Sequence, residues 1–390
     1  MNNLRPSSRT LAFPLILFLV TLAAAAPAAK GKYLFYVGTY TEEGSKSKGI
    51  YAYRYDAATS QITPLGLAAE TTNPSFVALH PNSRFLYAVN EVGNYHGPNS
   101  GGVSAFSIDR STGKLTFLNE VASRGADPCY ITVDKTGKYV LVANYTGGSV
   151  AVFPVLADGK LGESSAFVQH TGKGTNPERQ EGPHAHSIDL SLDNRFAMVD
   201  DLGLDELLVY KFDSSKGSLT SNSPPFTTIA AGSGPRHFAL GPDGKFAYVI
   251  SEMGHTVTAF SNDEANGRLQ VLQTVTTLPK DFTGRNDDAE IQVHPSGKFL
   301  YASNRGDDSI AIYAIDQSKG TLTQVAIVHT GGKEPRSFEI DPTGTLLFAE
   351  NQKSDNIVVF KIDQRTGLVT PTGQVLNVGS PVCLKFVAAE

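Results

Sequence analysis

The chain has 390 residues and a formal net charge of −5, and its scattered lysines and arginines form no basic run that would indicate nucleic-acid binding. Glycine is abundant at 37 residues and tryptophan is absent, a balance that favours a turn-rich β protein. The two cysteines, Cys129 and Cys383, are too few for a disulfide scaffold, so we expect both to be buried free thiols.

The N-terminal segment has the pattern of a secretory signal peptide. Arg5 and Arg9 precede an apolar run at residues 11–22, and alanine-rich residues continue to Ala29. The run is too short for a membrane-spanning helix, which needs about 20 residues. We therefore expect residues 1–29 to be removed and the protein to be secreted or periplasmic, free of the membrane after cleavage. An uncleaved anchor is the alternative.

The rest of the chain repeats one unit. Residues 73–91, 127–145 and 234–252 each contain an apolar run, a turn and a second apolar run, and further copies lie at 186–202, 288–305 and 334–352. A third strand follows, as at 102–109, and then a Gly-Lys-Leu type of turn and a fourth strand. Four antiparallel strands that repeat about every 46 to 55 residues are typical of propeller blades.

The copies predict the number of blades. Six are complete, while residues 32–70 supply only a second, third and fourth strand and residues 380–386 supply only a first strand. Joining the two ends in one sheet closes the ring and removes its exposed edges. We predict an all-β, seven-bladed β-propeller with four antiparallel strands per blade. It forms one domain over residues 30–390, closed by the C-terminal strand joining the N-terminal blade.

Polar residues that depart from the repeat are expected to converge at one mouth of the central channel. The start of each first strand and the end of each second strand share a face, and most blades carry small residues there. The mouth collects His186, Arg236, His237, Glu252, Glu290, Arg305 and Arg336, with Glu91 and Asp201 nearby and His184, Arg285 and Asp288 in flanking loops. Such a cluster indicates a ligand site. The alternative is that Arg–Glu pairs only join neighbouring blades.

The chemistry of this cluster favours an anionic substrate. No Gly-x-Ser-x-Gly elbow or phosphate loop occurs. His184 and His186 with nearby carboxylates form an alternative metal site, but the arginines would repel a divalent cation, so we expect no metal or cofactor. Arg236 and Arg305 suit a carboxylate, a phosphate or a polarised carbonyl, and His186 or Glu252 suits proton transfer. These groups fit metal-independent lactone hydrolysis, or lactone closure.

Several motifs resemble those of a known family. They are Gly-Pro-His-Ala-His-Ser at 182–187, Asp-Leu-Gly at 201–203, Gly-Pro-Arg-His at 234–237, Ser-Glu at 251–252, Ala-Glu-Ile at 289–291, Ser-Asn-Arg-Gly at 303–306, Glu-Pro-Arg at 334–336 and Pro-Val-Cys-Leu-Lys-Phe at 381–386. Together they resemble the seven-bladed propeller lactonase family. That family includes the propeller type of 6-phosphogluconolactonase and the fungal 3-carboxy-cis,cis-muconate lactonizing enzyme.

The resemblance implies a carboxylic ester hydrolase that acts on a small-molecule lactone or organic acid. It implies catalytic roles for His186, Arg236, Glu252 and Arg305, and we predict substrate binding by His184, His237, Glu290, Arg336 and Asp201. Because 6-phosphogluconolactone is a cytoplasmic intermediate, the signal peptide favours an unphosphorylated sugar lactone or another anionic lactone. A muconate-type lactonizing cycloisomerase and a non-catalytic ligand-binding propeller are the alternatives. We expect a monomer.

Overall fold

The computed structural model describes Met1 and residues 31–95 and 97–389. The predicted signal peptide, apart from Met1, lies outside these described residues. Within them, no helix has both the length and the apolar character needed to cross a membrane.

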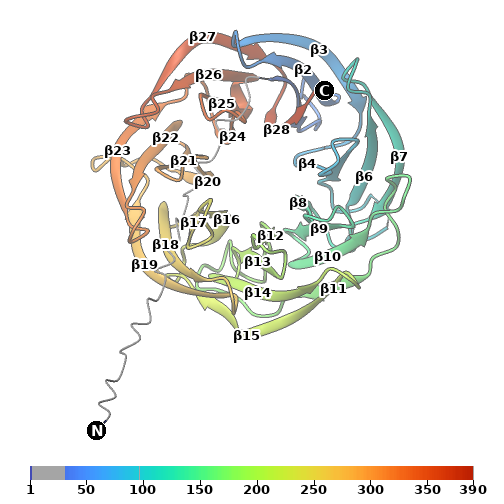
Figure 1. The fold of residues 1–390 in the computed structure, drawn as a ribbon. Helices are drawn as coiled ribbons and strands as arrows, with labels where there is room; N and C mark the ends of the chain where they lie inside the picture. Colours follow the sequence, from blue (N-terminus) through green and yellow to red (C-terminus); the bar gives the residue numbers. More distant parts are fainter. Residues whose placement is uncertain (2–30, 96, 390) are drawn as a thin grey trace.

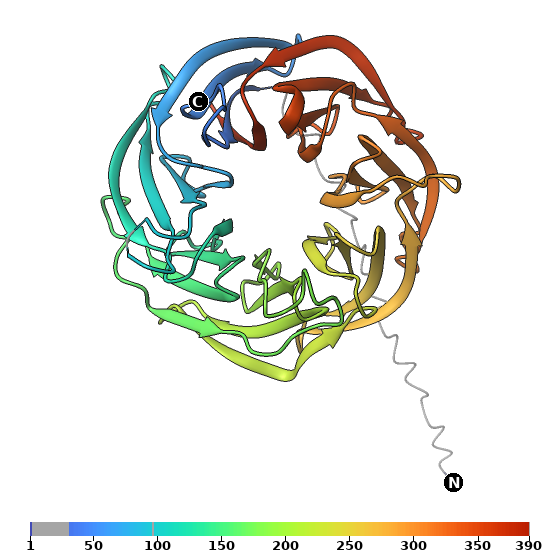
Figure 2. The same cartoon turned by 180° about the vertical axis from the view of Figure 1, so that it is seen from behind.

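The strands of the described residues form seven sheets of four antiparallel strands each. The sheets follow one another around a ring, with the chain running from one blade to the next (Figure 1). The same ring is seen from behind in Figure 2. This confirms the predicted seven-bladed propeller.

Each blade contributes one strand at each of four distances from the centre of the ring (Figure 1). The innermost strands are β28 (Pro381–Ala388), β4 (Val77–Leu79), β8 (Pro128–Val133), β12 (Asp189–Leu190), β16 (Pro235–Leu240), β20 (Asp287–Val293) and β24 (Pro335–Ile340). The second strands are β1 (Lys32–Thr39), β5 (Phe85–Asn90), β9 (Tyr139–Asn144), β13 (Phe196–Asp201), β17 (Phe246–Ser251), β21 (Phe299–Arg305) and β25 (Leu346–Asn351).

The remaining strands complete the blades. The third strands are β2 (Gly49–Asp56), β6 (Gly102–Ile108), β10 (Ser149–Pro154), β14 (Glu206–Asp213), β18 (Thr256–Asp263), β22 (Ser309–Ile315) and β26 (Asn356–Ile362). The outer strands are β3 (Gln61–Glu70), β7 (Leu115–Ala122), β11 (Ala166–Gln169), β15 (Ser218–Thr228), β19 (Arg268–Thr276), β23 (Leu322–His329) and β27 (Val369–Asn377). A single 3₁₀ turn in the described part, η1 (Gln352–Ser354), follows β25.

Burial explains the apolar runs that the sequence repeats. Every residue of β5 is buried, because its two faces pack against neighbouring blades, whereas the outer strand β7 carries exposed and half-buried residues. Buried side chains of adjacent blades form shared apolar clusters, so each blade is stabilised by its neighbours.

The two ends of the chain close the ring in one sheet. Strand β28 pairs antiparallel with β1, and Phe35 lies opposite Phe386 in this pairing. The Phe35 ring also stacks on Tyr53, with ring centroids 4.8 Å apart. The predicted closure by the C-terminal strand is therefore confirmed. Cys383 on β28 and Cys129 on β8 are both buried free thiols, as predicted.

A β-bulge occurs near the start of several innermost strands. The register between the first and second strands shifts between Pro128 and Tyr130, between Pro235 and His237, and between Pro335 and Ser337. The extra residues are Cys129, Arg236 and Arg336. A bulge bends a strand and redirects the side chain of the extra residue. Local backbone geometry, rather than simple strand alternation, therefore sets the direction of these three side chains.

The third blade is longer than the repeat predicts. Cys129 and His186 occupy equivalent positions but are 57 residues apart, outside the expected range of 46 to 55. The difference lies after β11, where residues 170–188 form a loop before β12 begins. Gln180 holds this loop together, because its amide oxygen accepts hydrogen bonds from the backbone N–H groups of Thr175 and Asn176 and its amide nitrogen donates to the Leu202 carbonyl.

Candidate active site

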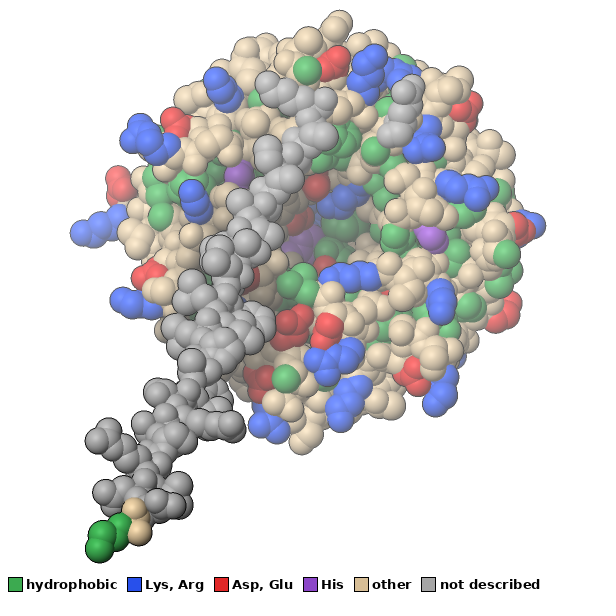
Figure 3. Space-filling view, in the orientation of Figure 1, with side chains coloured by type: hydrophobic (Ala, Val, Ile, Leu, Met, Phe, Trp, Pro, Cys, Tyr) green, Lys and Arg blue, Asp and Glu red, His purple; other side chains and the backbone are tan. Residues whose placement is uncertain are grey.

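A pocket of about 290 Å³ lies where innermost strands begin and second strands end. It is lined by Glu91, Cys129, Tyr145, Arg179, His186, Glu252, Arg285, Asp287, Arg305 and Arg336. The register therefore brings charged residues from separate blades together. Figure 3 shows the opposite face, on which β1 begins and β28 ends; the centre of the ring is hollowed there too, and charged side chains lie in the hollow.

The Glu252 carboxylate contacts three arginine side chains. Its Oε2 atom accepts from Arg236 Nε at 3.0 Å and lies 2.8 Å from Arg305 Nη2, while its Oε1 atom accepts from Arg179. Burial alone would raise the pKa of the Glu252 carboxyl, but Arg305, Arg236 and Arg179 outweigh burial and hold the pKa far below its usual range. Glu252 is therefore an ionised anchor for three guanidinium groups and a weak base.

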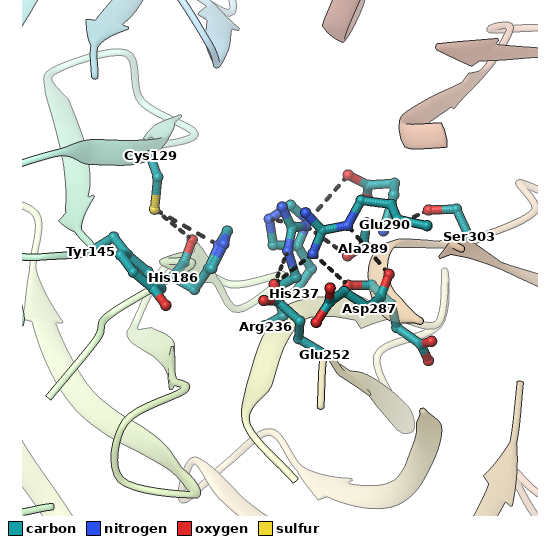
Figure 4. Close-up of polar contacts among 12 residues, drawn as sticks. Cys129, Tyr145, His186, Arg236, His237, Glu252, Asp287, Ala289, Glu290 and Ser303 are labelled. Carbon is teal, nitrogen blue, oxygen red and sulfur yellow. Dashed lines mark hydrogen bonds and ion pairs between the residues drawn. The ribbon is translucent and has the colours of Figure 1, made fainter. Parts of the chain in front are cut away.

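Arg236 is oriented by a hydrogen-bonded relay that reaches into the next blade (Figure 4). Its Nη1 donates to the Ala289 carbonyl at 2.7 Å and to His237 Nε2 at 3.1 Å. His237 Nδ1 then donates to Glu290 Oε2 at 3.1 Å. This pattern requires a neutral His237 with its proton on Nδ1. Burial and the adjacent Arg236 charge agree with it, because they lower the pKa of His237 to about 4.

His186 is also neutral, but it is less committed to protein partners. Its Nδ1 atom lies 3.7 Å from the Cys129 sulfur, and among the described residues its Nε2 atom has no hydrogen-bond partner. Burial, together with the Arg236 charge, lowers the pKa of His186 well below 6.5. The imidazole therefore presents an unprotonated nitrogen at neutral pH, as a general base requires.

Two more ionisable groups in the pocket keep atoms available for a ligand. The Arg336 guanidinium lies 5.3 Å from the centre of the Tyr40 ring and makes no hydrogen bond or ion pair within the part of the chain that the structure describes. Glu91 uses one carboxylate oxygen, Oε2, to accept from Tyr40 and Ser75. A guanidinium with unused donors is suited to a carboxylate or phosphate.

A layer of rings supports the pocket lining. His186 packs edge-on to His237 with ring centroids 5.2 Å apart, and His237 packs against Tyr130 at 5.1 Å. Tyr130 stacks on Phe76 at 4.3 Å. These rings hold the two histidines in place and surround them with an environment of low polarity, which explains their lowered pKa values.

Comparison with known proteins now decides the family. Residues 34–386 match the family model described as lactonase, seven-bladed beta-propeller. The chain belongs to this lactonase family. A 6-phosphogluconolactonase from Bacillus subtilis is 39% identical over 294 residues, which cover 75% of this chain and 81% of that protein. Another from Formosa agariphila is 34% identical, with 74% of this chain and 80% of that protein covered.

Solved structures support the same assignment for this lactonase. The periplasmic gluconolactonase of Pseudomonas aeruginosa is 36% identical and superposes with a TM-score of 0.86. The superposition covers 92% of this chain and 100% of that chain. The family match and these relatives identify the protein as a carboxylic ester hydrolase that acts on a small-molecule lactone.

The four residues predicted to be catalytic in the lactonase lie together. His186, Glu252 and Arg305 line the pocket, and Arg236 is held against Glu252 directly behind the lining. Arg336, predicted to bind substrate, also lines the pocket.

The other predicted binding residues of the lactonase stand outside the pocket lining. His237 contacts Arg236, and Glu290 contacts His237, as described above. His184 stacks on the Tyr145 ring with centroids 4.7 Å apart. Asp201 accepts from the His184 backbone N–H at 2.7 Å and contacts His170 Nδ1 at 2.6 Å. Their roles in binding stay predictions, but the contacts show that they position other residues of the site.

Sequence reasoning missed four residues that line the pocket, which are Cys129, Tyr145, Arg179 and Asp287. Arg179 lies on the 170–188 loop and reaches Glu252 and the Tyr145 hydroxyl, and Cys129 lies beside His186. Arg179 does not lie at a repeated strand position, so strand register does not assign it to the site. The excess length of the third blade was the available signal, because an insertion in a repeat protein often carries function.

Proposed function

We propose that this lactonase opens a sugar-type or other anionic lactone without a metal ion, and that the reaction takes place in the pocket lined by His186, Glu252 and Arg305. The observation that carries the proposal is the presence of a neutral His186, with an unused Nε2 atom, in the same pocket as a cluster of arginines. A base and a group that stabilises an oxyanion are the two components that ester hydrolysis needs.

His186 is the proposed base. It accepts a proton from water as the water oxygen attacks the lactone carbonyl carbon. Glu252 is the weaker candidate, because its three arginine partners hold its pKa far below the usual range. Glu252 instead aligns Arg236 and Arg305. The sequence did not distinguish His186 from Glu252 as the base. In this proposal His186 is the base and Glu252 positions the arginines.

Arg236 and Arg305 are the proposed electrostatic catalysts. Each keeps one terminal nitrogen, Nη2 in Arg236 and Nη1 in Arg305, without a partner among the residues that the structure describes. These nitrogens are available to stabilise the negative charge that develops on the carbonyl oxygen. Arg336 is proposed to hold an anionic group of the substrate or the carboxylate of the product.

A variant series tests this assignment. We expect His186→Ala to lower kcat/KM for a δ-lactone by about 10²–10⁴-fold and Arg305→Ala to lower it by about 10²–10³-fold. His329→Ala, at an exposed position on the outer strand β23, should leave activity unchanged. The acid limb of the wild-type kcat/KM profile should rise as pH rises through the lowered pKa of His186 and be complete by pH 6.5. Full activity in both His186→Ala and Arg305→Ala would refute the assignment, and loss of activity on treatment with a chelator would refute metal independence.

Export and an unphosphorylated substrate are also part of the proposal. They are supported by the apolar N-terminal pattern and by the similarity to a protein named as a periplasmic gluconolactonase. Mass spectrometry of the mature protein should find an N-terminus near residue 30, and kcat/KM should be higher for gluconolactone than for its 6-phosphate. A retained Met1 or the opposite preference would contradict these points. Incubation with the hydroxy acid would reveal net lactone closure, the alternative reaction.

A further inference from the structure

Glu91 is a carboxylate of the pocket to which the reaction so far assigns no role. It follows β5, and its backbone is held by Asn73, whose carbonyl accepts from the Glu91 N–H at 3.0 Å and whose side-chain amide donates to the Glu91 carbonyl at 3.2 Å. Glu91 lines the same pocket as His186 and Arg336. It comes from the second blade, whereas the arginines around Glu252 come from blades across the pocket and from the 170–188 loop. The pocket therefore has a carboxylate on each of two walls.

The two oxygens of Glu91 have different surroundings. Oε2 accepts from the Tyr40 hydroxyl at 2.8 Å and from the Ser75 hydroxyl. Oε1 has no hydrogen-bond partner among the described residues. Because both hydroxyl groups donate to Oε2, a proton carried by the carboxyl group belongs on Oε1. The two hydroxyls therefore orient the carboxyl group and leave Oε1 available to a ligand.

Lactone opening needs a proton at the ring oxygen, which is the leaving group, in addition to the base that serves the attacking water. When the tetrahedral intermediate collapses, the bond between the carbonyl carbon and the ring oxygen breaks and its electron pair stays on that oxygen. An aliphatic alkoxide is strongly basic, so its departure is faster when an acid delivers a proton to it. His186 serves the attacking water, and the charged arginines of the pocket are poor acids.

We propose that Glu91 Oε1 delivers the proton to the ring oxygen of the lactone as the ring opens, an inference that rests on the proposed function. Water gives one proton to His186 and its oxygen forms the new bond to the carbonyl carbon. The ring oxygen takes the Glu91 proton and becomes the hydroxyl of the product. Proton transfer from His186 to Glu91 through solvent restores both groups, so one lactone and one water yield one hydroxy acid.

The surroundings of Glu91 favour its protonated form more than those of an exposed glutamate do. Burial raises the pKa of Glu91 above the usual 4.5, and the Asp127 carboxylate raises it further. The Arg336 charge and the hydrogen bonds from Ser75 and Tyr40 lower the pKa, but the net shift is upward. The other groups of the pocket that bear charge or titrate are Cys129, Tyr145, Arg179, His186, Glu252, Arg285, Asp287 and Arg305. Three of these arginines are paired with carboxylates there: Arg179 and Arg305 with Glu252, and Arg285 with Asp287.

A comparison of leaving groups tests the proposal. We expect Glu91→Gln to lower kcat/KM for an aliphatic δ-lactone by about 10²-fold or more. For an aryl lactone such as dihydrocoumarin, whose phenolate leaves without acid assistance, the loss should be below about tenfold. His186→Ala should impair both substrates, because water attack precedes both departures. Glu163→Gln, an exposed glutamate outside the pocket, is the matched control and should retain activity on both lactones.

The result that overturns the proposal is an equal loss, or no loss, on the two lactones in Glu91→Gln, because a binding or structural role does not depend on the leaving group. Wild-type protein that opens neither lactone overturns the proposed function together with this inference. If the wild type opens both lactones and Glu91→Gln behaves as expected, but His186→Ala impairs only one of them, the assignment of His186 as the base is refuted and the role of Glu91 is not.

A second variant keeps the inference testable if Glu91→Gln does not fold. The Tyr40 hydroxyl donates to Glu91 Oε2, and this hydrogen bond lowers the pKa of Glu91. Tyr40→Phe removes the hydrogen bond, so the pKa of Glu91 should rise. The alkaline limb of the kcat/KM profile on the aliphatic lactone should then shift to higher pH. An unshifted limb in Tyr40→Phe overturns the proposal.

Discussion

At the scale of single residues, the pocket contains ionisable groups of two kinds. Glu252 has its oxygens engaged by three arginines, and Arg236 is 2% exposed and bonded to Glu252, His237 and a carbonyl. By contrast, His186 Nε2, Glu91 Oε1 and the Arg336 guanidinium have no hydrogen-bond partner among the described residues. The bonded atoms hold the shape of the site, and the unbonded atoms, which include Arg236 Nη2 and Arg305 Nη1, are left to meet a substrate.

Glu252→Gln tests the first kind through stability. The change leaves Arg236 and Arg305 without their negative partner, and breaking a buried pair on one side costs about 3–5 kcal/mol of unfolding free energy. Because the folded pKa of Glu252 is lowered, its contribution is fully present above its unfolded pKa near 4.5 and is lost progressively as pH falls from that value toward the folded pKa. Urea denaturation at pH 7 and at pH 4 should therefore show a smaller difference between wild type and variant at pH 4.

The control for this measurement is Asp158→Asn, in an exposed ion pair with Lys160. Solvent screens such a pair, so the variant should be as stable as the wild type. If Glu252→Gln cost no more than Asp158→Asn, the view of Glu252 as an anchor for the arginines would be wrong.

At the scale of elements, short irregular segments place the site. The bulges at Cys129, Arg236 and Arg336 set the directions of side chains that strand alternation alone does not set. The 170–188 loop adds Arg179, a group that no strand supplies. The strands provide a rigid frame, and their irregular starts and connections carry the chemistry.

The contact between the 182–186 segment and the turn after β13 gives an element-scale prediction. A Cβ at Gly203 would lie 1.9 Å from the Gly182 carbonyl oxygen and 2.8 Å from the His184 nitrogen. Gly203→Ala should displace the segment that leads to His186. We expect an unfolding free energy lower by about 1–3 kcal/mol and a kcat/KM lower by up to about 10²-fold.

Gly182→Ala is the matched control, since a Cβ there meets nothing within 4 Å. It should leave both the unfolding midpoint and kcat/KM close to the wild-type values. Equal behaviour of the two alanine variants would show that the close approach at Gly203 does not position the histidine.

At the scale of the whole molecule, ring closure by β28 couples the two chain ends. Leu384 on β28 is fully buried in an apolar cluster that includes residues of β1, β25 and β26. Leu384→Ala should lower the unfolding free energy by about 2–5 kcal/mol, because it removes buried surface and leaves a cavity. Thermal unfolding followed by circular dichroism and by activity should shift together, since the blades support one another.

Leu368→Ala is the control, because Leu368 is 38% exposed and precedes an outer strand. A similar loss in both variants would indicate that the closing strand adds no particular stability. The predicted monomer is a separate question, which sedimentation at several protein concentrations answers.

How much of this could be predicted from the sequence depends on which interactions decide each feature. The blade count, the closure and the gathering of His186, Arg236, Glu252 and Arg305 were predictable, because they follow from a repeated pattern and from strand register. These are local and periodic properties, so a residue's position in the repeat was sufficient to assign it to a face.

Only the tertiary structure decided the rest. Arg179 reaches Glu252 across 73 positions of the chain, through a loop whose path no periodicity predicts. The contrast between Glu252 and His186 as bases depends on how many guanidinium groups surround one and how deeply rings bury the other. The open oxygen of Glu91 depends on which way two hydroxyls point. The repeat determined the fold and the face of the site. Distances and burial in the folded chain determined which of its groups are free to act, because pKa values and hydrogen bonds depend on those distances.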